Sequence, residues 1–175
     1  MNDEPLPKQA DLRKLTARGA TFRSQMGLSR FPRLASAVHE GQGRIEVDLQ
    51  CGVNEQSVPY IAGAVSCEAS VLCQRCLEPV AIRFASDVNL GVVWGEDQAR
   101  QLPDGMDPLV VGEDELVDLN EIVEDELLLG LPIVSYHDVA ECSGHQQYES
   151  ADEAAKEVVK ENPFKVLEQL KSSKE

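Results

Sequence analysis

Three consecutive stretches of alternating apolar and polar residues constrain the fold more than any other feature. They span residues 44–51, 60–73 and 80–94, and short turn-like segments join them. Because successive side chains of a strand point to opposite faces, each stretch is typical of a half-buried β-strand. Long strands joined by short turns favour an antiparallel meander. The residues predicted for its core face are Ile45, Val47, Leu49, Cys51, Ile61, Val65, Cys67, Ala69, Val71, Ile82, Phe84, Val88, Leu90, Val92 and Trp94.

One amphipathic helix is predicted after the strands. Asp118 lies three residues before Glu121, which is the spacing of a capping box that opens a helix. Gly130 and Pro132 are typical of its end. The predicted apolar stripe is Leu119, Ile122, Val123 and Leu127, with Asp118, Glu121 and Asp125 facing solvent. We therefore predict an α+β fold, an antiparallel β-sheet meander with a packed acidic helix and a short docked C-terminal helix.

Charge and apolar content divide the chain into three predicted regions. Residues 1–40 are expected to form a basic, partly flexible N-terminal arm, with seven Lys or Arg against four Asp or Glu. A short helix beginning at Pro32 is its ordered part. Residues 41–147 form the α+β core domain. Residues 148–175 form an acidic linker and a short C-terminal helix capped by Asn162, which is too short to be stable without docking.

The composition excludes several classes of protein. The chain has 175 residues, 42% of them apolar, which suffices for one domain with a buried core. The longest near-apolar run, residues 127–134, falls far short of the roughly 20 residues that span a bilayer. The first residues lack a charged-then-apolar leader, so a cytoplasmic protein is expected. A net charge of −15 argues against a simple electrostatic nucleic-acid binder.

The five cysteines offer packing, redox or metal chemistry. An odd number without a leader is a poor fit to a secreted disulfide scaffold. Cys51 and Cys67 fall on predicted core faces and are interpreted as packing residues. Cys73 and Cys76 form a C-x-x-C in a turn between two strands. This pair is a redox couple, half of a zinc site, or a turn without metal, and the redox interpretation is weaker because such pairs normally begin a helix.

A second pair of ligand-type residues follows the acidic helix. With Cys73 and Cys76, the residues His137 and Cys142 would form a Cys3His set, the ligand count of a closed structural zinc site. His145 is an alternative ligand. Nitrogen and sulfur ligands favour zinc over magnesium or calcium, which prefer oxygen. A structural zinc ion is therefore the candidate cofactor.

The sequence lacks recognisable catalytic motifs. It contains no Gly-rich phosphate loop, no Ser-centred nucleophile elbow and no Ser/His/Asp set. Cys76 and His137 could act as nucleophile and base, but no oxyanion site accompanies them. We therefore expect a protein that is not an enzyme and has no small-molecule substrate. The alternative is a thiol redox protein or other Cys-dependent enzyme that uses Cys73 and Cys76.

Several short segments form a recognisable series along the chain. They are, in order, Cys73-Gln74-Arg75-Cys76-Leu77, Val117-Asp118-Leu119, Glu124-Asp125-Glu126-Leu127, Leu131-Pro132-Ile133-Val134, His137-Asp138 and Asn162-Pro163-Phe164 with Leu167. Taken together, they resemble the bacterial YceD family, the large ribosomal RNA subunit accumulation proteins. The resemblance implies a non-enzymatic role in the synthesis, processing or stability of 23S rRNA, and it carries over no catalytic residue.

A net charge of −15 leaves two ways to act in large-subunit production. The basic arm of residues 1–40 could contact rRNA directly, with the acidic body held away from phosphate. Alternatively, the acidic stretch of residues 96–126 could bind a strongly basic ribosomal protein and screen its charge. We favour the second way, in which the partner is the large-subunit precursor, reached through a basic ribosomal protein.

Overall fold

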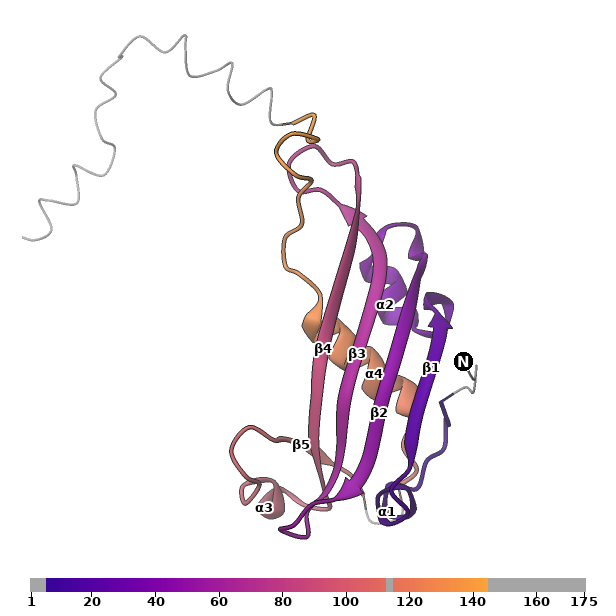
Figure 1. Ribbon diagram of the computed structural model, residues 1–175, viewed down its shortest axis with the longest axis vertical. Coiled ribbons are helices and arrows are strands. Elements are labelled where there is room, and N and C mark those ends of the chain that lie inside the picture. The colour runs from indigo at the N-terminus through magenta and orange to yellow at the C-terminus, as the bar shows by residue number, and fades with distance from the viewer. Residues whose placement is uncertain (1–5, 113–114, 145–175) are drawn as a thin grey trace, which may run out of the picture. The chain divides into compact units, whose positions relative to one another are not determined.

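The computed structural model describes residues 6–112 and 115–144. The chain divides into two compact units, Met1–His137 and Asp138–Glu175. All helices and strands of the described residues lie in the first unit (Figure 1). They are, in order, α1 (Leu12–Ala17), β1 (Thr21–Gly27), the 3-10 helix η1 (Leu28–Arg30), α2 (Pro32–Ala37), the 3-10 helix η2 (His39–Gly41), β2 (Gly43–Val53), β3 (Pro59–Leu72), β4 (Pro79–Val93), α3 (Glu96–Ala99), β5 (Asp107–Val110) and α4 (Leu119–Gly130).

The predicted α+β fold is confirmed. The three predicted strands correspond to β2, β3 and β4, which pair as antiparallel neighbours. The sheet has the order β1-β2-β3-β4-β5, and β5 runs parallel to β4, so the sheet is mixed. The short strand β5 was not predicted, because a four-residue strand beginning Asp-Pro carries no alternating pattern.

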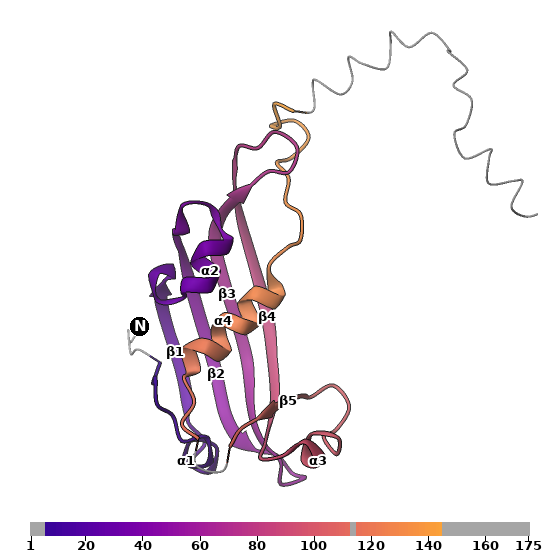
Figure 2. The same ribbon diagram turned by 180° about the vertical axis from the view of Figure 1, so that it is seen from behind.

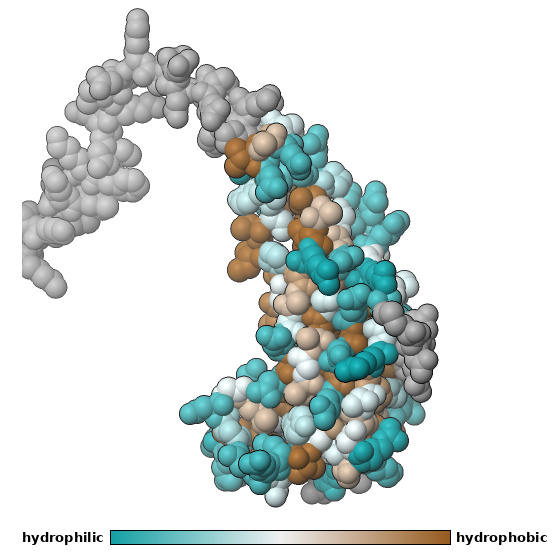
Figure 3. Space-filling model, viewed as in Figure 1, coloured by the Kyte–Doolittle hydropathy of each residue, from teal (hydrophilic) through white to brown (hydrophobic). Residues whose placement is uncertain are grey.

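One face of the sheet carries the core. Figure 2 shows α2 and α4 lying across this face, and Figure 1 shows the opposite face free of helices. Every residue that the sequence predicts for the core face of the strands is buried or packs against the core cluster. The opposite face carries many hydrophilic residues (Figure 3). Cross-strand ion pairs on it join Arg23 to Asp48 and Arg83 to Glu68.

The prediction of a partly flexible arm is wrong for residues 6–40. This segment supplies α1, β1 and α2, and β1 pairs with β2 along its whole length. The sequence does not reveal that its apolar residues are buried, because they are spread over elements too short to show a periodic hydrophobic pattern. The inward-facing side of β1 also includes the polar Ser24. The short helix predicted from Pro32 is confirmed as α2. The buried residues of the segment include Leu12, Leu15, Met26, Leu28, Phe31 and Leu34.

Helix α4 forms where it was predicted. The Asp118 side chain accepts a hydrogen bond from the Asn120 amide at 2.8 Å, and the four residues of the predicted apolar stripe are buried. Glu124, on the same helix, is buried as well. Its Oε1 accepts the amides of Arg33 and Leu34 at 2.7 and 3.1 Å. This carboxylate therefore fastens the first turn of α2 to α4, a role that the sequence did not reveal.

The second unit is described only as far as Gly144. The amides of Glu141 and Cys142 donate to the Asp138 carbonyl, which closes a single turn. His145 and the predicted linker and helix of residues 148–175 lie outside the described residues. None of the helices in the described part of the chain has the length and apolar character needed to cross a membrane.

Candidate metal centre

Cys73 and Cys76 lie in the tight turn that joins β3 to β4. The Cys73 amide donates to the Glu78 carbonyl at 2.9 Å, and Leu77, at φ 62°, donates back to the Cys73 carbonyl. This turn brings the two thiols of the C-x-x-C to the same side, as a zinc knuckle requires. The amide of Gln74 also donates to a carbonyl of the segment 131–137, which follows α4.

Three of the four predicted ligands meet in the first unit. The ligand atoms of Cys73, Cys76 and His137 all lie within 4.8 Å of one another. The distance from Cys76 Sγ to His137 Nδ1 is 3.3 Å. In a tetrahedral zinc site with Zn–S of about 2.3 Å and Zn–N of about 2.0–2.1 Å, sulfur and nitrogen lie about 3.5 Å apart. The observed separation therefore fits a shared metal ion.

The second nitrogen of His137 is held by the backbone. Its Nε2 lies 2.9 Å from the carbonyl oxygen of Pro79, the first residue of β4. A carbonyl can only accept, so Nε2 carries the proton and Nδ1 is directed at Cys76. Metal-bound histidines are oriented in this way, with the non-ligating N–H donated to a carbonyl or carboxylate.

Hydrogen bonding favours the charged forms of these groups. Burial acts to raise the pKa of the Cys73 thiol, but donation from the amides of Cys76 and His137 outweighs it and lowers the pKa to about 5. A hydrogen bond with Cys73 raises the pKa of the His137 imidazole to about 9, against the opposing effect of burial. Without metal, the centre thus holds a thiolate and an imidazolium at neutral pH, and the thiolate is the form that binds metal.

Arg75, between the two cysteines, brings a positive charge to the turn. Its guanidinium carbon lies 5.2 Å from the centre of the Tyr136 ring. The Arg75 Nη1 atom is buried without a hydrogen-bond partner among the described residues. Three thiolates around Zn²⁺ leave one net negative charge, which a neighbouring guanidinium would offset.

Two of the remaining cysteines are packing residues, as the sequence predicts. Cys51 and Cys67 are buried among the strands, and burial raises the pKa of each thiol to about 11, which suits packing and not metal binding. Cys142 belongs to the second unit, five residues after His137, and its place as the fourth ligand stays a prediction. No two of the five cysteines form a disulfide.

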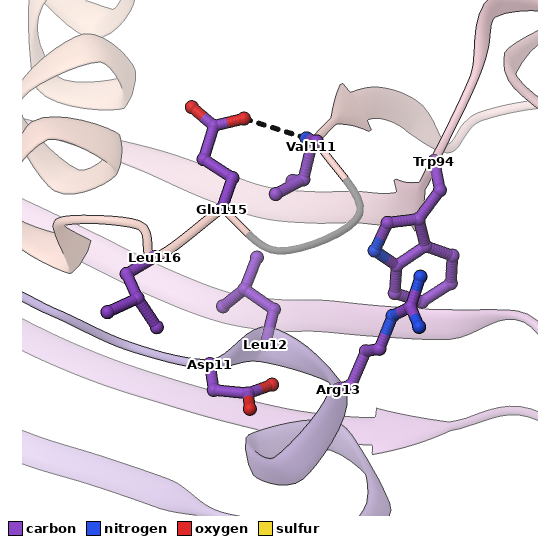
Figure 4. A pocket seen from close by; sticks show the side chains of 8 residues that line it. Asp11, Leu12, Arg13, Trp94, Val111, Glu115 and Leu116 are labelled. Atoms are coloured by element: carbon purple, nitrogen blue, oxygen red, sulfur yellow. Dashed lines mark hydrogen bonds between the residues drawn. The ribbon is translucent and has the colours of Figure 1, made fainter.

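The structure also shows a small pocket that sequence reasoning missed. Figure 4 shows the Arg13 guanidinium over the indole of Trp94, 4.6 Å from the ring centre. The carboxylates beside it are already engaged, since Asp11 accepts the Lys14 amide and Glu115 accepts the Gly112 amide. The contact joins α1 to the end of β4, and no sequence signal pointed to it. The pocket measures 280 Å³ and is lined by Asp11, Leu12, Arg13, Trp94, Val111, Gly112, Glu115 and Leu116.

Comparison with known proteins agrees with the family resemblance of the sequence. The family model described as "Large ribosomal RNA subunit accumulation protein YceD" matches residues 61–171. A protein of that same description from Haemophilus influenzae is 31% identical over 172 residues, which cover 98% of this chain and 99% of the relative. No solved structure is significantly similar. Because the family match covers more than half of the chain, and the relative aligns along nearly all of it, the chain belongs to the YceD family.

Proposed function

We propose that this protein supports the accumulation of large-subunit ribosomal RNA and does so without catalysis. The observation that carries the proposal is the near full-length similarity to a protein described as a large ribosomal RNA subunit accumulation protein. The chemistry of the cysteine and histidine cluster suits metal binding, and with Cys142 as the fourth ligand the centre would be closed and therefore structural.

The proposed direct partner is a basic ribosomal protein. Glu121 and Asp125 are exposed on α4, where Asp125 also pairs with Arg33, and Glu96, Asp97 and Asp107 are exposed in the segment from α3 to β5. These carboxylates are complementary to a lysine- and arginine-rich surface, which they would screen until that surface meets rRNA. The open face of the sheet is less suited to nucleic acid, because cross-strand ion pairs already engage its charges.

Direct rRNA contact through residues 1–40 is the less favoured route. Several of its cations are already engaged, because Lys14 pairs with Asp11 and Arg23 pairs with Asp48. Arg33 is held by Glu124. Phosphate binding draws on many available cations, and of the seven on this segment only Lys8, Arg13, Arg18 and Arg30 have no ion pair among the described residues.

The redox alternative retains one supporting observation, the lowered pKa of the Cys73 thiol. A redox nucleophile must be reachable by its substrate, whereas Cys73 is fully buried. The pair also lies between two strands and not at the start of a helix. A lowered pKa is equally what a metal-binding thiolate needs. We therefore assign Cys73, Cys76, His137 and Cys142 to a structural zinc site, which would tie the turn before β4 to the segment after α4.

Deletion of the gene should lower large-subunit rRNA relative to small-subunit rRNA. The ratio of 23S to 16S rRNA, measured in a clean deletion strain and in the same strain carrying the gene on a plasmid, tests this. The plasmid should restore the ratio. An unchanged ratio across several growth conditions would contradict the proposed cellular role.

Reversal of two exposed charges should weaken binding to basic ribosomal proteins. For the double variant Glu121→Lys/Asp125→Lys we expect affinity to fall about tenfold or more, because one opposite-charge contact in water contributes about 1 kcal/mol. Glu124 is left unchanged because it is buried. Affinity for proteins extracted from purified large subunits is measured at low and physiological salt, where screening should weaken wild-type binding.

A matched variant controls for net charge. Glu40→Lys/Glu55→Lys reverses two exposed carboxylates that lie outside α4, so it should bind nearly as the wild type does. If the α4 variant and the wild type bind the ribosomal proteins with equal affinity, the charge-screening mechanism is wrong. Tight wild-type binding to naked rRNA at physiological salt would contradict it as well.

A further inference from the structure

Strand β4 leaves much of its outer edge unpaired. β4 spans Pro79–Val93, but β5 pairs only with Leu90–Val93. Among the described residues, no strand pairs with the outer edge over residues 80–89. The Asn89 side chain donates to the Gly105 carbonyl, so we take residues 80–88 as the open edge. An open edge presents backbone N–H and C=O groups to any chain that can pair with it.

The open edge carries few of the sequence features that guard an edge strand against pairing. Proteins commonly guard an edge strand with proline, lysine or a bulge. Residues 80–88 contain neither proline nor lysine, and β4 pairs with β3 in an unbroken register along this length. Arg83 is the one Lys or Arg of residues 80–88, and it forms ion pairs with Glu46 on β2 and Glu68 on β3.

Exposed aliphatic residues lie at the end of α4 and on the segment that follows it, beside this edge. A β-carbon at Gly130 would lie 3.4 Å from the Ala85 carbonyl oxygen, so α4 ends against the middle of β4. The segment 131–137 then runs beside the edge to Pro79, as both views of the ribbon show (Figures 1 and 2). Leu129, Ile133 and Val134 are 80, 99 and 54% exposed. In Figure 3, apolar atoms project from this side of the molecule. Large aliphatic groups exposed together typically mark a binding surface.

Carboxylates surround the same edge. Glu126 Oε2 lies 3.4 Å from Ser86 Oγ on β4. Burial, and then the nearby charges of Asp107 and Asp125, raise the pKa of the Glu126 carboxyl. Asp87 is exposed on β4 itself. Among the described residues, no cation lies within ion-pair distance of Glu126, Asp87 or Asp107. The edge is therefore acidic as well as apolar.

We propose that residues 80–88 of β4, together with Leu129, Ile133 and Val134, bind an extended lysine- or arginine-rich segment of a partner protein as an added strand. Backbone pairing would supply affinity, the aliphatic side chains would pack on the segment, and the carboxylates would select basic residues. A second copy of this chain is a poor occupant because each copy carries a charge of −15. This proposal rests on the proposed function, since it gives the basic ribosomal partner a binding site.

Paired variants test the site. The probe is the mixture of proteins extracted from purified large subunits and freed of rRNA, and the bait is the full-length protein. Leu129→Ser/Ile133→Ser should lose at least tenfold in affinity for the retained protein. The control Val53→Ser/Leu116→Ser changes two aliphatic residues that are 51 and 54% exposed and lie outside the edge, and it should change affinity less than twofold. Thermal unfolding of each variant shows whether it folds.

Hydrogen exchange distinguishes strand addition from other contacts. The bound partner should protect amides of residues 80–88, while β1, the opposite edge of the sheet, keeps its exchange rates. The proposal is overturned if the edge variant, Leu129→Ser/Ile133→Ser, binds with wild-type affinity, or if the bound partner does not protect the β4 amides from exchange. A dimer that protects β4 without any ribosomal protein would assign the edge to a second copy and overturn it too.

The outcomes separate this proposal from the proposed function. If the α4 charge variant loses binding while the edge variant retains it, the edge proposal fails and the basic partner stands. If the wild type retains no ribosomal protein, the edge proposal and the charge-screening mechanism both fail. The 23S to 16S ratio in the deletion strain then decides the cellular role by itself.

Discussion

Purified without a metal-binding tag, the protein should contain one zinc ion per chain, and Cys76→Ser should lose it. The variant removes one thiolate from a set that already places Cys73, Cys76 and His137 within 4.8 Å of one another. We expect the melting temperature to fall by roughly 10 °C or more, because a structural zinc site contributes directly to folding and about 1 kcal/mol shifts Tm by about 2–4 °C in a chain of this size. Elemental analysis and thermal unfolding measure the two effects.

Cys67→Ser is the matched control. It makes the same chemical change at a buried cysteine that lies in the middle of β3, far along the strand from the turn. It should lose stability through packing alone and keep its zinc. Cys142→Ser tests the fourth ligand in the same way. Wild-type protein with less than roughly a tenth of a zinc ion per chain would contradict the metal proposal. In that case disulfide turnover by Cys73 and Cys76 becomes the property to measure.

Zinc binding should also depend on pH in a defined direction. In the metal-free protein the pKa of His137 is raised to about 9, so its imidazole is protonated at neutral pH. Zinc must displace that proton, and the apparent affinity should therefore rise as pH increases toward 9. Cys73, whose pKa is lowered to about 5, is already a thiolate over this range and contributes little to the slope. Calorimetry in buffers of different ionisation enthalpy counts the released protons.

Local pattern explains which parts of the fold were predictable. The strands β2, β3 and β4 each run for more than ten residues, so their alternation is long enough to stand out. Helix α4 was predictable as well, because the capping residue Asp118 and the apolar stripe that follows it form a local pattern at helical spacing. Residues 6–40 contribute elements of seven residues or fewer, whose burial depends on neighbours far along the chain. Burial of this kind is a tertiary property that a sequence window does not contain.

The candidate centre was predictable for a different reason. The C-x-x-C places two ligands close together by sequence spacing alone. His137 and Cys142 could be proposed as the second pair because histidine and cysteine are the residue types that bind zinc. The support around these ligands was not predictable. The Pro79 carbonyl that orients His137, and the ring of Tyr136 under Arg75, are brought there by the sheet and by the segment after α4. The open edge of β4 could not be predicted either, because it depends on β5 pairing with only the last four residues of β4.

Replacement of Glu124 should destabilise the protein more than any change at the exposed acids of α4. The Glu124 carboxylate satisfies the amides of Arg33 and Leu34 in the first turn of α2 and also accepts Arg33 Nε at 2.9 Å. Glu124→Leu leaves two backbone donors without a partner in a buried setting, and each such donor costs about 1–3 kcal/mol. We therefore expect a loss of about 2–4 kcal/mol in the free energy of unfolding, measured by urea denaturation with Trp94 fluorescence.

A graded series assigns that loss to the backbone donors. Glu124→Gln keeps one oxygen for the two amides but presents an NH2 group to the Arg33 guanidinium, so its loss should be smaller than that of Glu124→Leu. Asp125→Asn removes only the exposed ion pair with Arg33, which is worth about 0–1 kcal/mol. Glu121→Gln, on the exposed side of the same helix, should be close to neutral. If Glu124→Leu unfolds within about 0.5 kcal/mol of Glu121→Gln, the buried carboxylate is not what holds α2 on α4, because surface substitutions alone vary by that much.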